Sequence, residues 1–255
     1  MQKKKDFENF SEQERLHLTN FFSAFFCTEP ATFTLFGTKP LTLSVQVCDS
    51  DAMLFQRGHY WESLRAMYIW EKHKLLFYQK QFCLKFEKKK SSIQTWLINK
   101  KAAHKAIEEN IDYFRHVLKK EVNPTQLVEE MIGGEYLEEA IGYHEGLLGV
   151  LLGYGRENSE LFCRLSKVSK KLKKQVGFTE NGELEKKLGF FALEKKGFSL
   201  FGTPCFRAVE NSNETRLLQE QYSKELTEIS QKYMLKDFLQ VTIERLCEEK
   251  DEKDM

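Results

Sequence analysis

The sequence predicts an α+β fold that is mostly helical and has a small antiparallel sheet. Apolar residues recur at helical spacing over most of the chain from residue 99 onward, whereas the two-residue period of a strand occurs in short segments, mainly of the N-terminal half. The regular alternation of strands and helices that a doubly wound parallel sheet requires is missing. We expect one α+β domain over residues 6–248, followed by a charged, frayed tail at 249–255.

The composition is that of a folded protein without a strong electrostatic preference. Of 255 residues, 41% are hydrophobic, and phenylalanine (21) is common while proline (4) is scarce. Disordered chains have few aromatic residues and a high net charge, so a packed core is expected. The 39 basic and 38 acidic residues nearly cancel, which gives no strong evidence for a nucleic-acid partner.

The N-terminal half contains one capped helix and the strands. Ser11 followed by Glu14 has the form of a capping box, and the helix that it opens presents Leu18, Phe21, Phe22, Phe25 and Phe26 on one face. Residues 33–36 read as a short strand, and 41–47 alternate as a half-buried strand does. Residues 61–70 are expected to be helical. Residues 82–86 and 93–98 are expected to pair as a hairpin.

From residue 99 helices are expected to dominate. We place them at about 125–132, 135–152, 159–176 and 213–249, with a strand at 198–201 and an uncertain stretch at 177–197. The last helix carries two apolar faces that are rotated from each other, which predicts either a kink near Met234 or different packing partners at its two ends. The sequence of 33–38 recurs almost unchanged at 198–203, so the two segments are expected to be neighbouring strands with the same exit turn.

Four glycines mark the helix expected at 135–152 as central to the core. Gly142, Gly146, Gly149 and Gly153 fall within an arc of about 60° on a helical wheel. Each glycine inside a helix costs about 1 kcal/mol relative to alanine, so a close neighbour must offset them. We expect another backbone to approach this stripe.

The same region holds the candidate binding residues, which are His144, Glu145, Arg156 and Asn158. They would line a pocket, and a helix that starts beside Arg156 could hold an anion on its free N–H groups. The alternative is a buried histidine and a tight glycine corner with purely structural roles. The sequence favours the structural interpretation.

A second candidate is a basic patch on the helix at 159–176. Its members are Arg164, Lys167, Lys170, Lys171 and Lys174. Such a face could meet a phosphate, an acidic partner or a membrane surface, but an ordinary solvated helix looks the same.

Signatures of catalysis, metal and cofactor binding are missing from the sequence. There is no nucleophile elbow, phosphate loop, dinucleotide fingerprint or paired-histidine zinc motif. The six cysteines include no close pair, so reduced thiols are expected rather than a metal site. We predict no cofactor and no metal. No window is apolar for the roughly 20 residues that cross a bilayer, so a soluble, cytoplasmic protein without a transmembrane segment is expected.

Four phrases carry a resemblance: residues 33–40, 97–101, 144–149 and 151–158, which read FTLFGTKP, LINKK, HEGLLG and LLGYGREN. Over residues 20–170 the chain resembles a group of uncharacterised proteins from chlamydia-like intracellular bacteria. No activity is attached to that group, so no catalytic residue is carried over. The resemblance implies that a host-facing or developmental role is conceivable, including export into a host cell without a cleavable signal peptide.

The leading functional hypothesis is a non-enzymatic binding or interaction protein that uses a helical surface. It depends on the missing catalytic motifs, the basic patch and the two apolar faces of the C-terminal helix, one of which is a candidate contact for a protein partner. The alternative is a hydrolase- or transferase-like enzyme with a pocket near residues 144–158. The sequence leaves the oligomeric state open.

Overall fold

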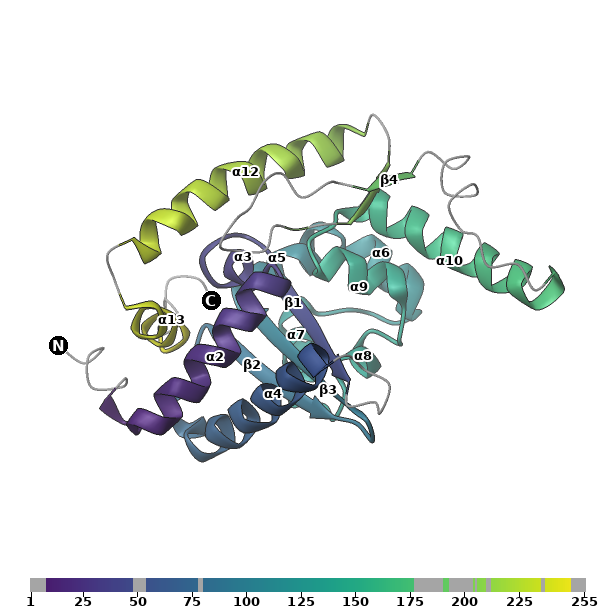
Figure 1. The fold of residues 1–255 in the computed structure, drawn as a ribbon. Helices are drawn as coiled ribbons and strands as arrows, with labels where there is room; N and C mark the ends of the chain where they lie inside the picture. Colours follow the sequence, from purple (N-terminus) through teal and green to yellow (C-terminus); the bar gives the residue numbers. More distant parts are fainter. Residues whose placement is uncertain are drawn as a thin grey trace. The chain divides into compact units, whose positions relative to one another are not determined.

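A computed structural model gives the fold and describes residues 8–47, 54–77, 80–176, 190–192, 204, 206–209, 212–234 and 237–248. The fold is α+β and mostly helical, with a three-stranded antiparallel sheet, as predicted (Figure 1). The chain contacts separate into two compact units. Unit 1 comprises residues 1–103, 200–202 and 225–255, and unit 2 comprises 104–199 and 203–224.

Unit 1 contains the sheet, in the order β1-β3-β2. Its elements are α2 (Glu12–Thr28), α3 (Ala31–Phe36), β1 (Leu41–Val47), α4 (Leu54–Lys72), the 3-10 helix η1 (Lys74–Phe77), β2 (Phe82–Lys88), β3 (Ser92–Asn99) and α13 (Phe238–Leu246). Helices α3 and α4 pack on β1 and β3, and α2 packs on α4 and α13. Helix α5 (Lys100–Glu109) begins in this unit and continues in unit 2.

Several N-terminal predictions are confirmed. Ser11 caps α2 in a complete capping box with Glu14, and all five predicted apolar residues of that helix are buried. Strands β2 and β3 form the predicted hairpin, with Leu84 opposite Leu97. The helix predicted at residues 61–70 is part of α4.

The strand predicted at 33–36 is wrong, because these residues belong to helix α3. Residues 31–35 are all buried, so the segment shows no difference between two faces by which periodicity could separate a strand from a helix. Pro30 immediately precedes the helix, where a residue without a free N–H is tolerated. The second copy of the phrase, at 198–203, lies outside the described residues, as does the strand predicted at 198–201.

Strand β1 forms where predicted, but its buried side differs from the expectation. Thr42 and Ser44 are buried, whereas Val45 and Val47 are exposed. The polar side can be buried because its groups are paired: the Thr42 hydroxyl lies 2.8 Å from that of Thr34.

In its described residues, unit 2 is built from helices and one short strand pair. Its elements are α6 (Ile111–Leu118), α7 (Pro124–Gly133), α8 (Leu137–Ala140), α9 (Glu145–Leu151), α10 (Arg156–Val176), β4 (Phe190–Ala192) and β5 (Arg207–Val209). Helix α12 (Asn213–Tyr233) supplies residues 213–224 to this unit and the rest to unit 1. Helix α10 packs on α9 and on β5.

The single helix predicted at 135–152 is wrong. The chain forms α8, a turn and then α9, and both Gly142 and Tyr143 have positive φ in the turn. A glycine at positive φ ends a helix at little cost. Close neighbours do approach two of the four glycines, but the nearest atoms belong to side chains rather than to the predicted backbone. A Cβ on Gly146 would lie 2.2 Å from Tyr113 Oη, and one on Gly149 would lie 2.5 Å from Ser159 Oγ.

The C-terminal prediction is confirmed in its main feature, because α12 ends at Tyr233 and α13 starts at Phe238. The apolar residues of the two faces are buried or half-buried where the structure describes them. Tyr222 and Ile229 represent the first face, and Leu239, Ile243 and Leu246 represent the second. The boundary of the single domain predicted over 6–248 stays a prediction, and the tail at 249–255 lies outside the described residues.

Candidate functional site

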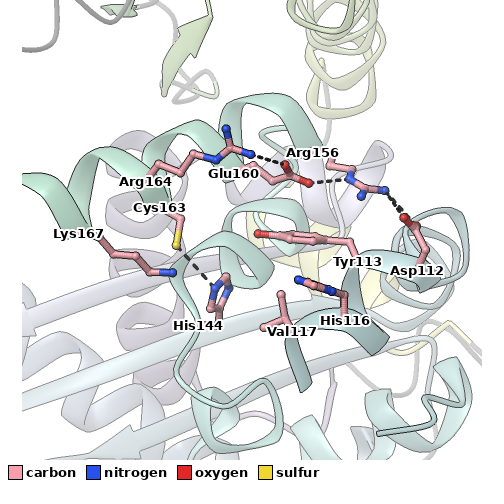
Figure 2. Close-up of a pocket in the computed structure, with 10 residues that line it drawn as sticks. All are labelled: Asp112, Tyr113, His116, Val117, His144, Arg156, Glu160, Cys163, Arg164 and Lys167. Carbon is pink, nitrogen blue, oxygen red and sulfur yellow. Dashed lines mark hydrogen bonds and ion pairs between the residues drawn. The ribbon is translucent and has the colours of Figure 1, made fainter. Parts of the chain in front are cut away.

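A cleft of about 590 Å³ lies within unit 2, on the side where α6, the turn before α9, and α10 meet (Figure 2). Helix α10 supplies four polar or charged side chains and one cysteine to it, and α6 supplies four residues. The lining residues are Asp112, Tyr113, His116, Val117, His144, Arg156, Glu160, Cys163, Arg164 and Lys167.

The structure brings together two of the four predicted binding residues. His144 and Arg156 both line the cleft. Glu145 is the first residue of α9 and does not line it. Asn158 is buried and acts as a structural bridge: its side chain donates to Tyr154 O and accepts from Val209 N and Thr215 Oγ1, at 2.7, 2.8 and 3.2 Å.

The predicted basic patch contributes to the same cleft. Arg164 and Lys167 line it. Lys170, Lys171 and Lys174 lie on α10, but their side chains are outside the described part of the structure. The patch and the pocket were separate predictions, and the structure brings Arg164 and Lys167 of the patch together with His144 and Arg156 of the pocket.

The start of α10 already holds an anion, and that anion belongs to the chain. The carboxylate of Glu214 accepts hydrogen bonds from the backbone N–H groups of Arg156 and Glu157, each at 2.8 Å. Gly155 makes room for it, since a Cβ there would lie 2.5 Å from the same carboxylate. The predicted anion site at this helix start is therefore filled internally, by a residue 58 positions away in sequence.

Arg156 is held between two carboxylates and has little capacity for a ligand. Its Nη1 donates to both oxygens of Asp112, at 3.0 and 2.8 Å, and its Nε donates to Glu160 at 2.7 Å. The bond to Glu160, followed by that to Asp112, raises the pKa of Arg156, and Arg156 in turn lowers the pKa of Asp112. The guanidinium also lies 5.1 Å from the centre of the Tyr113 ring.

The remaining positive charge of the cleft lies on Arg164 and Lys167. Three basic and two acidic side chains line the cleft, which leaves one excess positive charge when the histidines are neutral. Among the described residues, Arg164 makes only a long contact to Glu160, at 3.7 Å, and its side chain is 76% exposed. No carboxylate in the described part of the chain pairs with Lys167, which is exposed at the cleft edge.

His144 contacts both the helix that follows it and a cysteine of the cleft. Its Nδ1 accepts from the backbone N–H of Leu147 at 3.3 Å and thereby caps α9. Its Nε2 lies 3.6 Å from the Sγ of Cys163 (Figure 2). Burial, and next the charge of Lys167, lower the pKa of His144, whereas Glu145 opposes the change.

Sequence reasoning missed Cys163 and Tyr113 as cleft residues. Cys163 was grouped with the other dispersed cysteines because no ligand or partner lies close to it in sequence. Its position on α10, four residues before Lys167, was the available signal, since residues three or four apart share a helix face. Tyr113 could have been found only through its packing on Gly146.

Neither a metal cluster nor a membrane-spanning helix occurs among the described residues. Among the described residues no group of three or more histidine, cysteine or acidic side chains is placed to hold a metal ion. No described helix combines the length and apolarity that a membrane crossing needs.

Comparison of the chain with protein-family models, with curated proteins and with solved structures gave no match. The resemblance to proteins of chlamydia-like bacteria therefore stays a prediction, and function has to be argued from the cleft itself.

Proposed function

We propose that the chain is a non-enzymatic binding protein whose helical surface, formed by α6, the turn before α9, and α10, holds a small anionic ligand in the cleft. The observation that carries the proposal is the pair Arg164 and Lys167, which line one cavity while the acidic residues beside them are engaged by Arg156. Cations that are not neutralised by their neighbours attract anions, and a concave site strengthens that attraction.

The size of the cleft suits a small molecule. Ligand pockets usually have volumes of about 300–1,000 Å³, with a few polar groups that fix the orientation of the ligand. The cleft, at about 590 Å³, lies within that range. The Arg164 fork and the Lys167 ammonium match phosphate or carboxylate oxygens, so a ligand that carries one of these groups is favoured.

The structure gives less support than the sequence did for a protein partner that binds the C-terminal helices. Both of their apolar faces are occupied within the chain at the described positions, including Ile229 and Ile243, which are 1% and 0% exposed. A docking face requires apolar surface that remains accessible. The cleft is therefore the helical surface on which we base the binding proposal.

Isothermal titration calorimetry of the full chain at low ionic strength tests this proposal, with inorganic pyrophosphate and citrate as the anionic probes and glucose as the neutral one. We expect both anions to bind and glucose not to bind. The double variant Arg164→Met/Lys167→Met should bind the anions about tenfold or more weakly, because charge-assisted hydrogen bonds are lost.

A matched control removes two other positive charges of unit 2. Lys105 and Arg216 are exposed and lie outside the cleft, each in an ion pair four residues along its helix. The variant Lys105→Met/Arg216→Met should bind pyrophosphate as the parent chain does. Equal weakening in both double variants would mean that general charge, not the cleft, attracts the anion, and the proposal would be rejected.

The alternative function, a hydrolase- or transferase-like enzyme with a pocket near residues 144–158, has one supporting observation. This is the contact between His144 and Cys163, which are residue types that act together in nucleophilic catalysis. The hydrogen bonds of His144 limit what that pair can do.

A further inference from the structure

The hydrogen bonds of His144 assign its proton. A backbone N–H of Leu147 points at Nδ1, so Nδ1 must offer a lone pair and cannot carry hydrogen. In a neutral imidazole the proton then resides on Nε2, which is the nitrogen that faces Cys163. His144 is therefore a hydrogen-bond donor to the sulfur, whereas a catalytic base would have to accept the proton of the thiol.

The surroundings keep His144 in this neutral form. Burial and the nearby Lys167 charge both lower the pKa of His144. Protonation would put a hydrogen on Nδ1, directly against the N–H of Leu147, and would break the cap of α9. The fold therefore stabilises the tautomer that donates to Cys163.

Cys163 is enclosed by protein and open to the cleft. Its residue is 5% exposed, yet it is one of the residues that line the cavity. Tyr113, Glu160, Arg164 and Lys167 line the same cavity. Burial first, and then the charges of Cys163 and Glu160, raise the pKa of Tyr113 to about 12, so this phenol stays protonated.

We propose that Cys163 is the nucleophile of the cleft, that the neutral His144 imidazole stabilises its thiolate by donating Nε2–H, and that it reacts with small electrophiles that carry a negative charge. The thiol proton leaves to water. The thiolate then attacks the electrophilic carbon, an S–C bond forms, and the leaving group departs with the electron pair of the bond that breaks. The anion preference rests on the proposed function, whereas the nucleophilicity of Cys163 does not.

The first experiment alkylates the folded full chain with iodoacetamide, a neutral reagent, at pH 7 and maps each of the six cysteines by peptide mass spectrometry. We expect Cys163 to be alkylated several times faster than the exposed Cys27, although Cys163 is the more buried of the two. If Cys163 reacts only after denaturation, or more slowly than Cys27, it is an inert core thiol and the proposal is overturned.

Two variants separate the role of His144 toward sulfur from its role as a cap. Asparagine is a strong capping residue whose side chain reaches only as far as Nδ1, so His144→Asn keeps the cap and removes the donor. Glutamine places an amide N–H near the position of Nε2, so His144→Gln keeps a donor and weakens the cap. We expect the alkylation rate of Cys163 to fall about tenfold in His144→Asn and to recover substantially in His144→Gln.

The opposite order would contradict the proposal. If His144 serves only to cap α9, the alkylation rate of Cys163 should depend on how much of α9 remains folded. His144→Gln, which weakens the cap, should then change this rate more than His144→Asn does. Circular dichroism and thermal unfolding of both variants show how much of the helix each retains. Cys163→Ser is the negative control that identifies the Cys163 peptide in the mass spectra.

The third comparison distinguishes failure of this proposal from failure of the anion site. Iodoacetate is the negatively charged analogue of iodoacetamide and transfers a carboxymethyl group with loss of iodide. We expect the ratio of the iodoacetate rate to the iodoacetamide rate at Cys163 to exceed that at Cys27 several-fold, and Arg164→Met/Lys167→Met to abolish the excess. If Cys163 reacts fast with iodoacetamide but shows no such excess for iodoacetate, the claim that Cys163 is a nucleophile would stand and the anion preference would be refuted.

Discussion

Lys39 is a buried lysine whose ammonium is satisfied by neutral oxygen atoms. It is 1% exposed, and its Nζ donates to the backbone oxygen of Leu41 and, at 3.1 Å, to the hydroxyl of Thr42. Burial lowers the pKa of Lys39 to about 7 from 10.5, although the charge of Glu29 opposes this change. A buried cation of this kind makes the stability of the chain depend on pH.

The first prediction concerns that dependence. Between pH 7 and 10.5 the unfolded chain binds a proton at Lys39 that the folded chain does not, so the free energy of unfolding should rise with pH over this window and level off below it. Lys39→Met should flatten the rise and stabilise the chain at pH 7. Urea unfolding at several pH values measures both, with Lys105→Met as the control. Parallel profiles for Lys39→Met and the parent chain would show that Lys39 is not buried as described.

His144 gives a second prediction, in the acid range. Its pKa is lowered from 6.5 in the folded chain, so the unfolded chain binds the proton more readily as pH falls below 6.5. The stability contributed by neutral His144 is complete above about pH 6.5 and is lost as pH falls toward the folded value. His144→Asn should remove this part of the acid dependence while retaining the cap. An unchanged acid profile in His144→Asn would contradict the lowered pKa of His144 in the folded chain.

At the level of elements, Gly149 determines how closely α9 and α10 pack. A Cβ on Gly149 would lie 2.9 Å from the Cβ of Ser159, which joins α9 to α10, whereas a Cβ on Gly133, at the end of α7, would meet nothing within 4 Å. We predict that Gly149→Ala lowers the free energy of unfolding by about 1–3 kcal/mol through overpacking. Gly133→Ala should leave it unchanged or raise it by up to about 1 kcal/mol. Chemical denaturation of the two variants makes the comparison, and equal effects would refute the close approach.

A fourth prediction concerns the junction of α10 and α12. Glu214 accepts from two N–H groups at the start of α10, and the Ser212 hydroxyl donates to Glu157 at 2.6 Å while accepting from Thr215 N. Glu214→Ala should therefore destabilise the chain by about 1 kcal/mol, as the loss of a cap does. Glu220→Ala, which removes an exposed ion pair from the same helix, should cost less than about 0.5 kcal/mol. Thermal unfolding distinguishes the two.

The sequence predicted most elements correctly where a cap or a clear period was present. The capping box of α2, the hairpin of β2 and β3, and the break near Met234 are local signals, and all three appear in the structure. Prediction failed where the period is ambiguous, at the fully buried α3, and where positive φ at Gly142 and Tyr143 divides one apolar pattern into two helices.

The candidate site was predictable only in part, because the contacts that assemble it join residues that lie far apart in the sequence. His144, Arg156, Arg164 and Lys167 could be identified as polar groups near a glycine corner. These four residues converge because the chain turns at Gly142. Asn158 does not line the cleft, because its side chain is bound to Val209 and Thr215 instead. Such tertiary partners, 51 and 57 residues away, leave no local pattern in the sequence.

For the whole molecule, the structure separates the core from the cleft. Unit 1 buries the sheet and the aromatic face of α2, and within unit 2 the Tyr222 hydroxyl donates to Gly153 O at 2.7 Å, which ties α12 to the end of α9. These contacts have structural roles. The cleft instead combines open volume with positive charge that no neighbouring carboxylate fully neutralises.

The most direct test of the central claim is a pyrophosphate titration of the full chain, followed through the imidazole resonances in NMR spectra. His116 and His144 line the cleft, whereas His59 belongs to α4 in unit 1. We predict that the resonances of His116 and His144 shift together and saturate, while those of His59 remain in place. Shifts of all three without saturation, or no shift at His144, would contradict the claim that the cleft between α6, the turn before α9, and α10 binds an anion.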